Sequence, residues 1–328
     1  MLTKIDFLPN VAPGIFVTWT LHNFCNYRCS YCPPGCHAGT KRPYTADDVI
    51  RFSLEIVKAA QMRRYEHFTI AFSGGEPTLF PEFERILEVL YANKVDVIFT
   101  SNGSRNLEFW KKVTPHFNHC VWSFHPQFAN WNDFYEKARF VSQHCWLNVD
   151  FMMTAESFEQ NLEYAREMAK LDNVRVDFVP IQKNFGGESE GLIGYSDEQL
   201  RILQNVPYKF KEPTGEVLEK RKKFLRFGRG LKFVESIVDG KRVEEILNYK
   251  SLIAKNQNNF KGWTCLAGIE SLVVDMDGSV KRAYCNEGGV IGDIWNPVSL
   301  PTKPVICTMN SCKCSVDIEV SKYAEGEY

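Results

Sequence analysis

The sequence lacks the features that would direct a chain to a membrane or through it. No apolar run approaches the roughly 20 residues that a transmembrane helix needs. The first twenty residues contain no basic segment followed by a continuous apolar one, so we predict no signal peptide. Charge of one sign is not in excess either: 39 Lys and Arg against 40 Asp and Glu give a net charge of −1. This balance disfavours nucleic acid or a membrane surface as the main partner.

Cysteine, by contrast, is plentiful, with 11 residues in a chain of 328. Most of these cysteines lie towards the two ends of the chain, and no secretion signal accompanies them. A reducing, cytoplasmic compartment with metal-bound thiolates therefore fits better than a disulfide framework. Cys120 and Cys145 lie in apolar surroundings, and we predict that both are ordinary core residues.

The most informative motif is the run CNYRCSYC, in which Cys25, Cys29 and Cys32 have C-x3-C-x2-C spacing. Three thiolates on one short loop can hold three irons of a 4Fe–4S cluster and leave the fourth iron without a protein ligand. A structural zinc site is the alternative, and Cys36 and His37 follow closely enough to complete it. Zinc loops more often use two C-x2-C pairs, so the cluster is favoured.

A second motif follows about forty residues later in the sequence. The β-favouring run 67–73 ends in Ser73, and Gly74, Gly75 and Glu76 come directly after it. Paired glycines let the backbone approach a ligand closely. A carboxylate beside them can accept hydrogen bonds from an ammonium group. The two motifs, in this order, resemble those of the radical S-adenosylmethionine (radical SAM) superfamily.

The resemblance implies a 4Fe–4S cluster on the three loop cysteines, with SAM bound at the open iron through its amino and carboxylate groups. One electron from the reduced cluster would cleave SAM to methionine and a 5′-deoxyadenosyl radical, which abstracts a substrate hydrogen. The electron would come from an external reductant of the flavodoxin or ferredoxin type. Family positions imply that the following residues contact SAM: Tyr31 (against the adenine), Ser73, Gly74, Gly75, Glu76 (through the SAM amino group), Asn102, Ser123, His125 and Gln182.

Short β-favouring runs alternate with amphipathic helical windows from residue 14 to about 182, which predicts a parallel sheet with helices packed outside it. The expected strands are 14–21, 67–73, 96–101, 120–124, 146–153 and 174–179. The expected helices are one opened by a Thr45–Asp48 capping box, one at 81–94 with Pro81 in its first turn, and others at 106–113, 131–143 and 156–170. The resemblance implies an α/β fold, a partial (β/α)6 barrel with its active site at the C-terminal strand ends.

Five further cysteines lie in residues 263–315, and a hairpin turning at Asp277-Gly278 is predicted between the first two. This arrangement resembles the twitch domain, a smaller relative of the SPASM domain, and implies one auxiliary 4Fe–4S cluster. A zinc knuckle is the alternative. The expected ligands are Cys265, Cys285, Cys312 and Cys314, with Cys307 as an alternative ligand.

We expect a radical SAM core at 1–182, an irregular or helical connecting region at 183–262 and an auxiliary-cluster domain at 263–328. Within the connecting region, 184–194 is expected to be a loop and 216–227 a basic helix. The auxiliary cluster would accept an electron from a substrate radical.

Dehydrogenation is therefore the first expected outcome, and epimerisation the next, with Cys36 as the candidate hydrogen donor. Only 24 residues precede the cluster loop, which disfavours a leader-peptide or cobalamin domain. The expected substrate is a small polar metabolite such as a sugar or aminocyclitol. Two alternatives remain: an enzyme that modifies a peptide or protein side chain, and a non-catalytic Fe–S or zinc protein.

Overall fold

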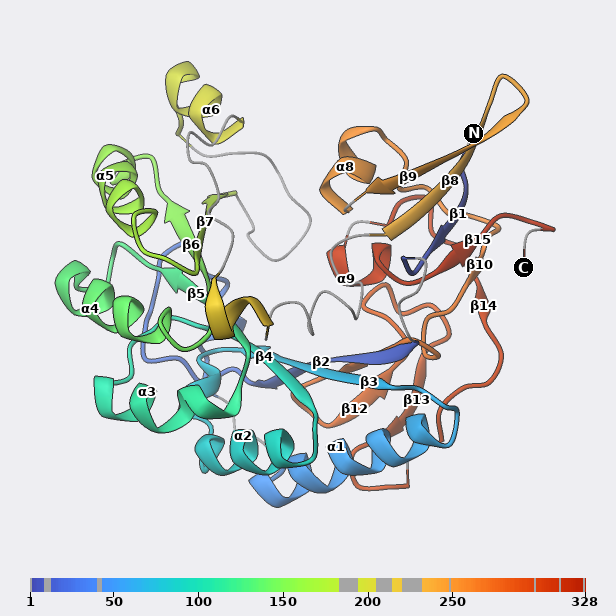
Figure 1. The fold of residues 1–328 in the computed structure, drawn as a ribbon, viewed down its shortest axis with the longest axis horizontal. Helices are drawn as coiled ribbons and strands as arrows, with labels where there is room; N and C mark the ends of the chain where they lie inside the picture. The colour runs from blue at the N-terminus through green and yellow to red at the C-terminus, as the bar shows by residue number, and fades with distance from the viewer. Residues whose placement is uncertain are drawn as a thin grey trace.

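A computed structural model describes residues 2–8, 13–39, 43–182, 194–204, 214–219, 232–247, 249–297, 299–312, 314–326 and 328. These residues build a nine-stranded sheet and a six-stranded sheet, seen side by side in Figure 1. No helix in the described ranges is both long enough and apolar enough to cross a membrane.

The nine-stranded sheet has the order β13-β12-β11-β2-β3-β4-β5-β6-β7, and its strands from β2 to β7 are parallel. These six strands are β2 (Gly14–His22), β3 (His67–Gly74), β4 (Asp96–Ser101), β5 (His119–Phe124), β6 (Trp146–Met153) and β7 (Val174–Pro180). Helices follow the strands along the outside of the curved sheet (Figure 1): α1 (Ala46–Gln61), α2 (Phe83–Ala92), α3 (Leu107–Val113), α4 (Trp131–Val141) and α5 (Phe158–Met168). The expected partial barrel, its six strands and its five helices are confirmed. Short 3-10 helices cover Pro34–Cys36, Pro77–Leu79 and Thr114–His116.

The main core lies between this sheet and its helices. Trp19 of β2 is fully buried and contacts the rings of Tyr44, Phe52 and Phe72. Burying a large aromatic side chain contributes about 2–3 kcal/mol, so these positions fix how α1 lies on β2 and β3. Cys120 and Cys145 are buried too, which confirms their predicted place in the core.

The starts of α1 and α2 differ in how well the sequence predicted them. Thr45 and Asp48 form the expected capping box at the start of α1. The prediction that Pro81 lies in the first turn of α2 is wrong. Glu82 is the N-cap residue and adopts a left-handed conformation with φ 55°, so Pro81 lies before the helix, which begins at Phe83.

A C-terminal hairpin extends the same sheet beyond β2. It consists of β11 (Ser271–Val274) and β12 (Ser279–Lys281), and β13 (Val290–Asp293) pairs with β12. The predicted turn at Asp277-Gly278 is confirmed, since the Gly278 N–H donates to the Asp275 carbonyl at 2.9 Å and Gly278 has φ 86°. The pairing of this hairpin with the barrel strands was not predicted: β11 pairs in parallel with β2, more than two hundred residues away in sequence.

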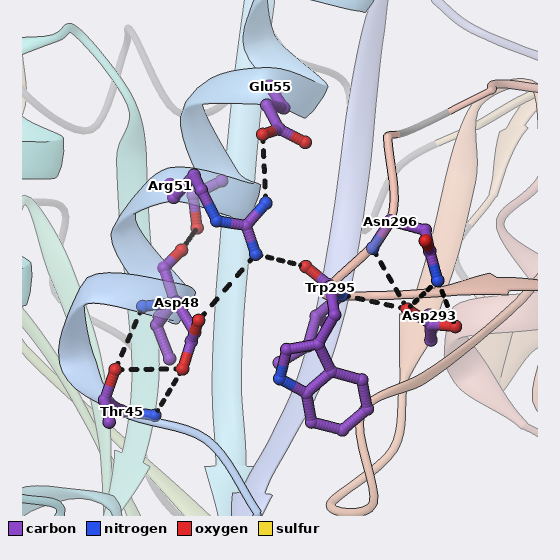
Figure 2. Close-up of polar contacts among 10 residues, drawn as sticks. Thr45, Asp48, Arg51, Glu55, Asp293, Trp295 and Asn296 are labelled. Atoms are coloured by element: carbon purple, nitrogen blue, oxygen red, sulfur yellow. Dashed lines mark hydrogen bonds and ion pairs between the residues drawn. The ribbon is translucent and has the colours of Figure 1, made fainter.

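Arg51 of α1 joins this C-terminal hairpin to the barrel helices (Figure 2). Its Nη2 donates to the Ile294 carbonyl at 2.6 Å, directly after β13. The same guanidinium pairs with Glu55 at 3.0 Å and Asp48 at 3.8 Å, which keeps it extended towards the hairpin. One arginine thus ties a helix of the barrel to the chain that leads to the C-terminal cysteines.

The six-stranded sheet is antiparallel and has the order β14-β10-β15-β1-β8-β9. Its strands are β1 (Leu2–Asp6), β8 (Lys232–Val238), β9 (Lys241–Leu247), β10 (Thr264–Cys265), β14 (Val305–Ile306) and β15 (Lys322–Tyr323). Further helices in the described residues include α6 (Asp197–Gln204), α8 (Tyr249–Ala254) and α9 (Ser315–Ile318). Figure 1 shows α9 between this sheet and the barrel.

Two parts of this arrangement were not expected. Residues of the predicted 1–182 core form β1, which lies between β8 and β15 of the second sheet. The region expected to be irregular or helical contains the β8–β9 hairpin. The predicted loop at 184–194 lies outside the described residues except for Gly194, and the predicted helix at 216–227 is described only to residue 219, where it is helical. The proposed division into three domains stays a prediction.

Candidate active site

A cavity of about 330 Å³ lies at the C-terminal ends of the parallel strands. The loop between β2 and α1 supplies one wall, with the thiols of Cys25, Cys29 and Cys32. The other walls come from the ends of β3 to β7 and from residues just beyond them: Gly74, Gly75, Thr100, Ser101, Asn102, Ser123, His125, Asp150, Met152 and Val179. Loop residues Tyr27, Tyr31, Cys36 and His37 complete the lining. Side chains that the sequence spreads over more than a hundred residues therefore face one space.

The paired glycines allow two backbones to cross. The Gly75 N–H donates to the His22 carbonyl at 2.7 Å, and the Glu76 N–H donates to the Phe24 carbonyl at 2.6 Å. A Cβ atom on Gly75 would lie 2.1 Å from the Phe24 oxygen, and Gly74 has φ 120°. We expected the close approach to be to a ligand, but the first neighbour is the start of the cysteine loop. The glycines thus position that loop against β3.

Glu76 is buried and already hydrogen-bonded within the chain. Its Oε1 accepts from the hydroxyls of Thr78 at 2.6 Å and Ser101 at 2.9 Å, and its Oε2 accepts from the Asn102 N–H at 2.6 Å. Burial raises the pKa of this carboxyl, and these hydrogen bonds oppose the rise. In this arrangement the carboxylate joins the ends of β3 and β4, while Gly74 and Gly75 line the cavity in its place.

Asn102 and its neighbours hold the first cysteine. Asn102 Nδ2 donates to Asn26 Oδ1 at 2.9 Å and lies 3.8 Å from Cys25 Sγ. The Tyr27 N–H also points to Cys25 Sγ, at 3.4 Å. Hydrogen bonds to a sulfur favour its thiolate form, as ligation of iron requires.

His125 and Tyr31 form a pair at the second cysteine. Their rings are stacked, with centroids 6.0 Å apart, and Tyr31 OH lies 2.9 Å from His125 Nδ1. Cys29 Sγ lies 3.5 Å from the same nitrogen. Burial lowers the pKa of His125 to about 4, so the imidazole is neutral at pH 7.

The chemistry of the donors fits a thiolate-bound cluster with SAM beside it. Burial raises the pKa of Cys25 and Cys29, and burial together with the nearby Cys36 raises that of Cys32 to about 12. Thiols in such surroundings ionise when a cation binds them. The rest of the cavity offers backbone, amide and hydroxyl groups suited to a polar cofactor. Across the described ranges, no three His, Cys, Asp or Glu side chains are arranged to hold a single metal ion.

Most predicted SAM contacts lie together, and a few residues were missed. Gln182 forms a β-bridge beyond β7 and is not among the cavity residues. Asp150 and Met152 line the cavity but were not predicted, although a carboxylate inside the apolar strand 146–153 was a usable signal. Gln127, also missed, accepts from the Ser30 N–H at 2.8 Å and steadies the cysteine loop.

A second, smaller pocket lies in the C-terminal region and is lined by four cysteines: Cys265, Cys285, Cys307 and Cys312. Cys265, Cys307 and Cys312 are buried, and Cys285 is half-buried. Cys314 is not part of this lining; it is the N-cap residue of α9. Burial raises the pKa of Tyr284 and the charge of Cys314 raises it further, so Cys314 lies in the neighbourhood of Tyr284. The structure thus groups Cys307, our alternative ligand, with the other three.

Residues 19–170 match the family model described as the Radical SAM superfamily, which confirms the predicted resemblance for this part of the chain. Mycofactocin maturase MftC of Mycobacterium ulcerans (strain Agy99) is 31% identical over 91 residues, which are 28% of this chain and 23% of that protein. The same protein of Mycobacterium tuberculosis (strain CDC 1551 / Oshkosh) is also 31% identical over 91 residues, again 28% of this chain and 22% of the relative. The match thus spans less than a quarter of these curated relatives.

Solved structures with a similar chain path include Streptococcus suis SuiB bound to S-adenosylmethionine, at 12% identity and a TM-score of 0.49. That match covers 87% of this chain and 64% of SuiB. SuiB bound to the precursor peptide SuiA gives 11% identity and a TM-score of 0.48, with coverage of 83% and 60%.

Proposed function

We propose that the protein reductively cleaves SAM at a 4Fe–4S cluster and abstracts a hydrogen atom from a peptide substrate. The proposal rests mainly on one observation: three loop thiols and the ends of β3 to β7 face the same cavity. When bound, the cluster and SAM together supply a 5′-deoxyadenosyl radical. Cys25, Cys29 and Cys32 would hold the cluster, and the backbone of Gly74 and Gly75 would face the SAM amino group.

The other cavity residues position and shield the reactants. The Tyr31 ring is fixed by its stacking on His125, so it offers a rigid face to the adenine. Asn102 is held at the loop by Asn26, and Ser123 points from the end of β5 into the same space. Asp150 and Met152 line the cavity from β6, and we propose that the substrate binds at this part of the cavity. Reactants held in this way lose little further entropy on reaching the transition state.

The comparisons favour a peptide substrate over the small metabolite expected from the sequence. The curated relatives are named maturases, and a SuiB structure contains a precursor peptide. No described feature selects a sugar or aminocyclitol. We therefore propose side-chain modification of a peptide or protein.

We further propose that Cys265, Cys285, Cys307 and Cys312 bind an auxiliary cluster. Four thiols line one largely buried pocket, which suits a thiolate-bound group. A substrate radical that loses one electron to this centre and one proton to solvent or a base would complete a two-electron oxidation. Cys36 lines the first cavity and is exposed, so it stays the candidate hydrogen donor for epimerisation.

The test is 5′-deoxyadenosine formation by anaerobically reconstituted protein with SAM and dithionite. We expect formation to require Cys29 and to rise above the substrate-free rate with a defined peptide library. A panel of sugars and aminocyclitols is the matched comparison. Stimulation by that panel alone would reject the peptide proposal. Iron-loaded protein that yields no 5′-deoxyadenosine under any condition would reject the activity, and zinc without iron would favour a structural metal protein.

A further inference from the structure

Lys322 places a buried positive charge at the C-terminal cysteine pocket. It stands on β15 directly opposite Cys265 of β10 in an antiparallel pair. Residues directly opposite in such a pair point to the same face of the sheet. Lys322 lines the pocket with Cys265, Cys285, Cys307 and Cys312, and only 2% of it is exposed.

The ammonium group is held by main-chain carbonyls. It donates to the oxygens of Asp317, of Ile318 at 3.3 Å and of Val320 at 2.9 Å, around the end of α9. It also lies 5.1 Å from the centre of the Phe260 ring. These neutral groups fix the ammonium in place without cancelling its charge.

The nearby Asp317 carboxylate is engaged elsewhere. Its two oxygens accept from the N–H groups of Tyr284 at 3.1 Å and Cys285 at 2.8 Å. Asp317 thus holds the segment that carries Cys285, while the Lys322 ammonium bonds to carbonyls. A buried cation is costly unless negative charge lies close by; the Asp317 carboxylate lines the same pocket, and four thiolates around a cluster would add to its charge.

We propose that Lys322 raises the reduction potential of the C-terminal cluster by holding a fixed positive charge beside its cysteines. The inference rests on the proposed auxiliary cluster. Reduction adds one negative charge to the cluster, and a buried cation stabilises that charge more than the oxidised form. Lys322 is thus a positioning residue that makes the centre a better electron acceptor.

The experiment uses full-length protein in which Cys25, Cys29 and Cys32 are changed to Ala, so that iron can load only at the C-terminal site. The midpoint potential is measured by redox titration followed by electron paramagnetic resonance, together with iron content and far-UV circular dichroism. Lys322→Gln keeps N–H donors for the carbonyls but removes the charge. Lys322→Arg keeps both. Lys4→Gln is the control, because Lys4 of β1 is partly exposed and pairs with Asp6 at 2.9 Å.

We expect a more negative potential in Lys322→Gln, with Lys322→Arg and Lys4→Gln near the parent value. Loss of cluster or fold in Lys322→Gln but not in Lys322→Arg would also support a requirement for the charge. An unchanged potential in iron-loaded Lys322→Gln would overturn the inference, as would loss of cluster or fold in both Lys322 variants, because Lys322 would then serve only to hold α9. A parent protein that binds no iron at all would instead reject the auxiliary cluster itself.

Discussion

Glu76 Oε2 accepts a hydrogen bond from the Asn102 N–H at 2.6 Å, which joins the end of β3 to the end of β4. Both residues were themselves expected to contact SAM. The bond shows that the acidic residue of the GGE segment is used to build the cavity wall. Its effect on SAM would then pass through the position of Asn102, which in turn contacts the loop that carries Cys25.

Glu76→Gln is expected to lower the free energy of unfolding by about 1–3 kcal/mol. The NH2 group of the new amide would face a hydrogen-bond donor at a position where a carboxylate oxygen now accepts. SAM binding should weaken at the same time, and iron content should stay close to that of the parent. Denaturant unfolding and calorimetric titration with SAM measure the two effects. Glu82→Gln, on an exposed residue paired with Arg85, is the control. Weaker SAM binding with unchanged stability would point instead to a direct contact with the SAM ammonium.

Gly75→Ala is expected to disrupt the cysteine loop. The new Cβ would lie 2.1 Å from the Phe24 carbonyl oxygen, so one of the two backbones must move. We expect a loss of more than about 2 kcal/mol in stability and a large loss of iron from the first site. Iron analysis and thermal unfolding of the reconstituted protein measure both.

Gly35→Ala is the matched control for this change. Gly35 lies on the same loop, and a Cβ there would meet no atom within 4 Å. It should bind iron as the parent does. Equal iron loss in the two variants would mean that the loop tolerates no substitution at all, and that the crossing at Gly75 has no special role.

The sequence predicted the barrel and its cavity well because their signals are local. Each strand is a short apolar run, and the polar residues at its end, such as Asn102 and Ser123, meet because parallel strands end at one edge. The second sheet was missed for the opposite reason. Leu2–Asp6 is a short strand whose partners lie more than two hundred residues away. The choice between Cys307 and Cys314 was equally hidden, since the spacing of the C-terminal cysteines did not decide it; in the structure Cys307 lines the pocket and Cys314 is the N-cap residue of α9.

Arg51→Met is expected to loosen the C-terminal hairpin from α1. The variant removes a 2.6 Å bond to the Ile294 carbonyl and ion pairs whose side chains are 27–40% exposed. We expect a loss of about 0.5–1.5 kcal/mol, most of it from the carbonyl bond, because exposed ion pairs contribute little. Arg85→Met removes comparable surface pairs without contacting the hairpin and should cost less. Equal losses in urea unfolding would show that the Ile294 contact contributes nothing of its own.

The ligands of the C-terminal site can be distinguished by two matched substitutions. In protein that lacks Cys25, Cys29 and Cys32, Cys307→Ala is expected to abolish most iron binding, because Cys307 shares a pocket with three other thiols. Cys314→Ala should retain the iron, since Cys314 lies outside that pocket, at the start of α9. Iron content and the visible absorption of the cluster measure both variants, and circular dichroism checks the fold. Iron loss confined to Cys314→Ala would restore the ligand set expected from the sequence, and would require α9 to move when the cluster binds.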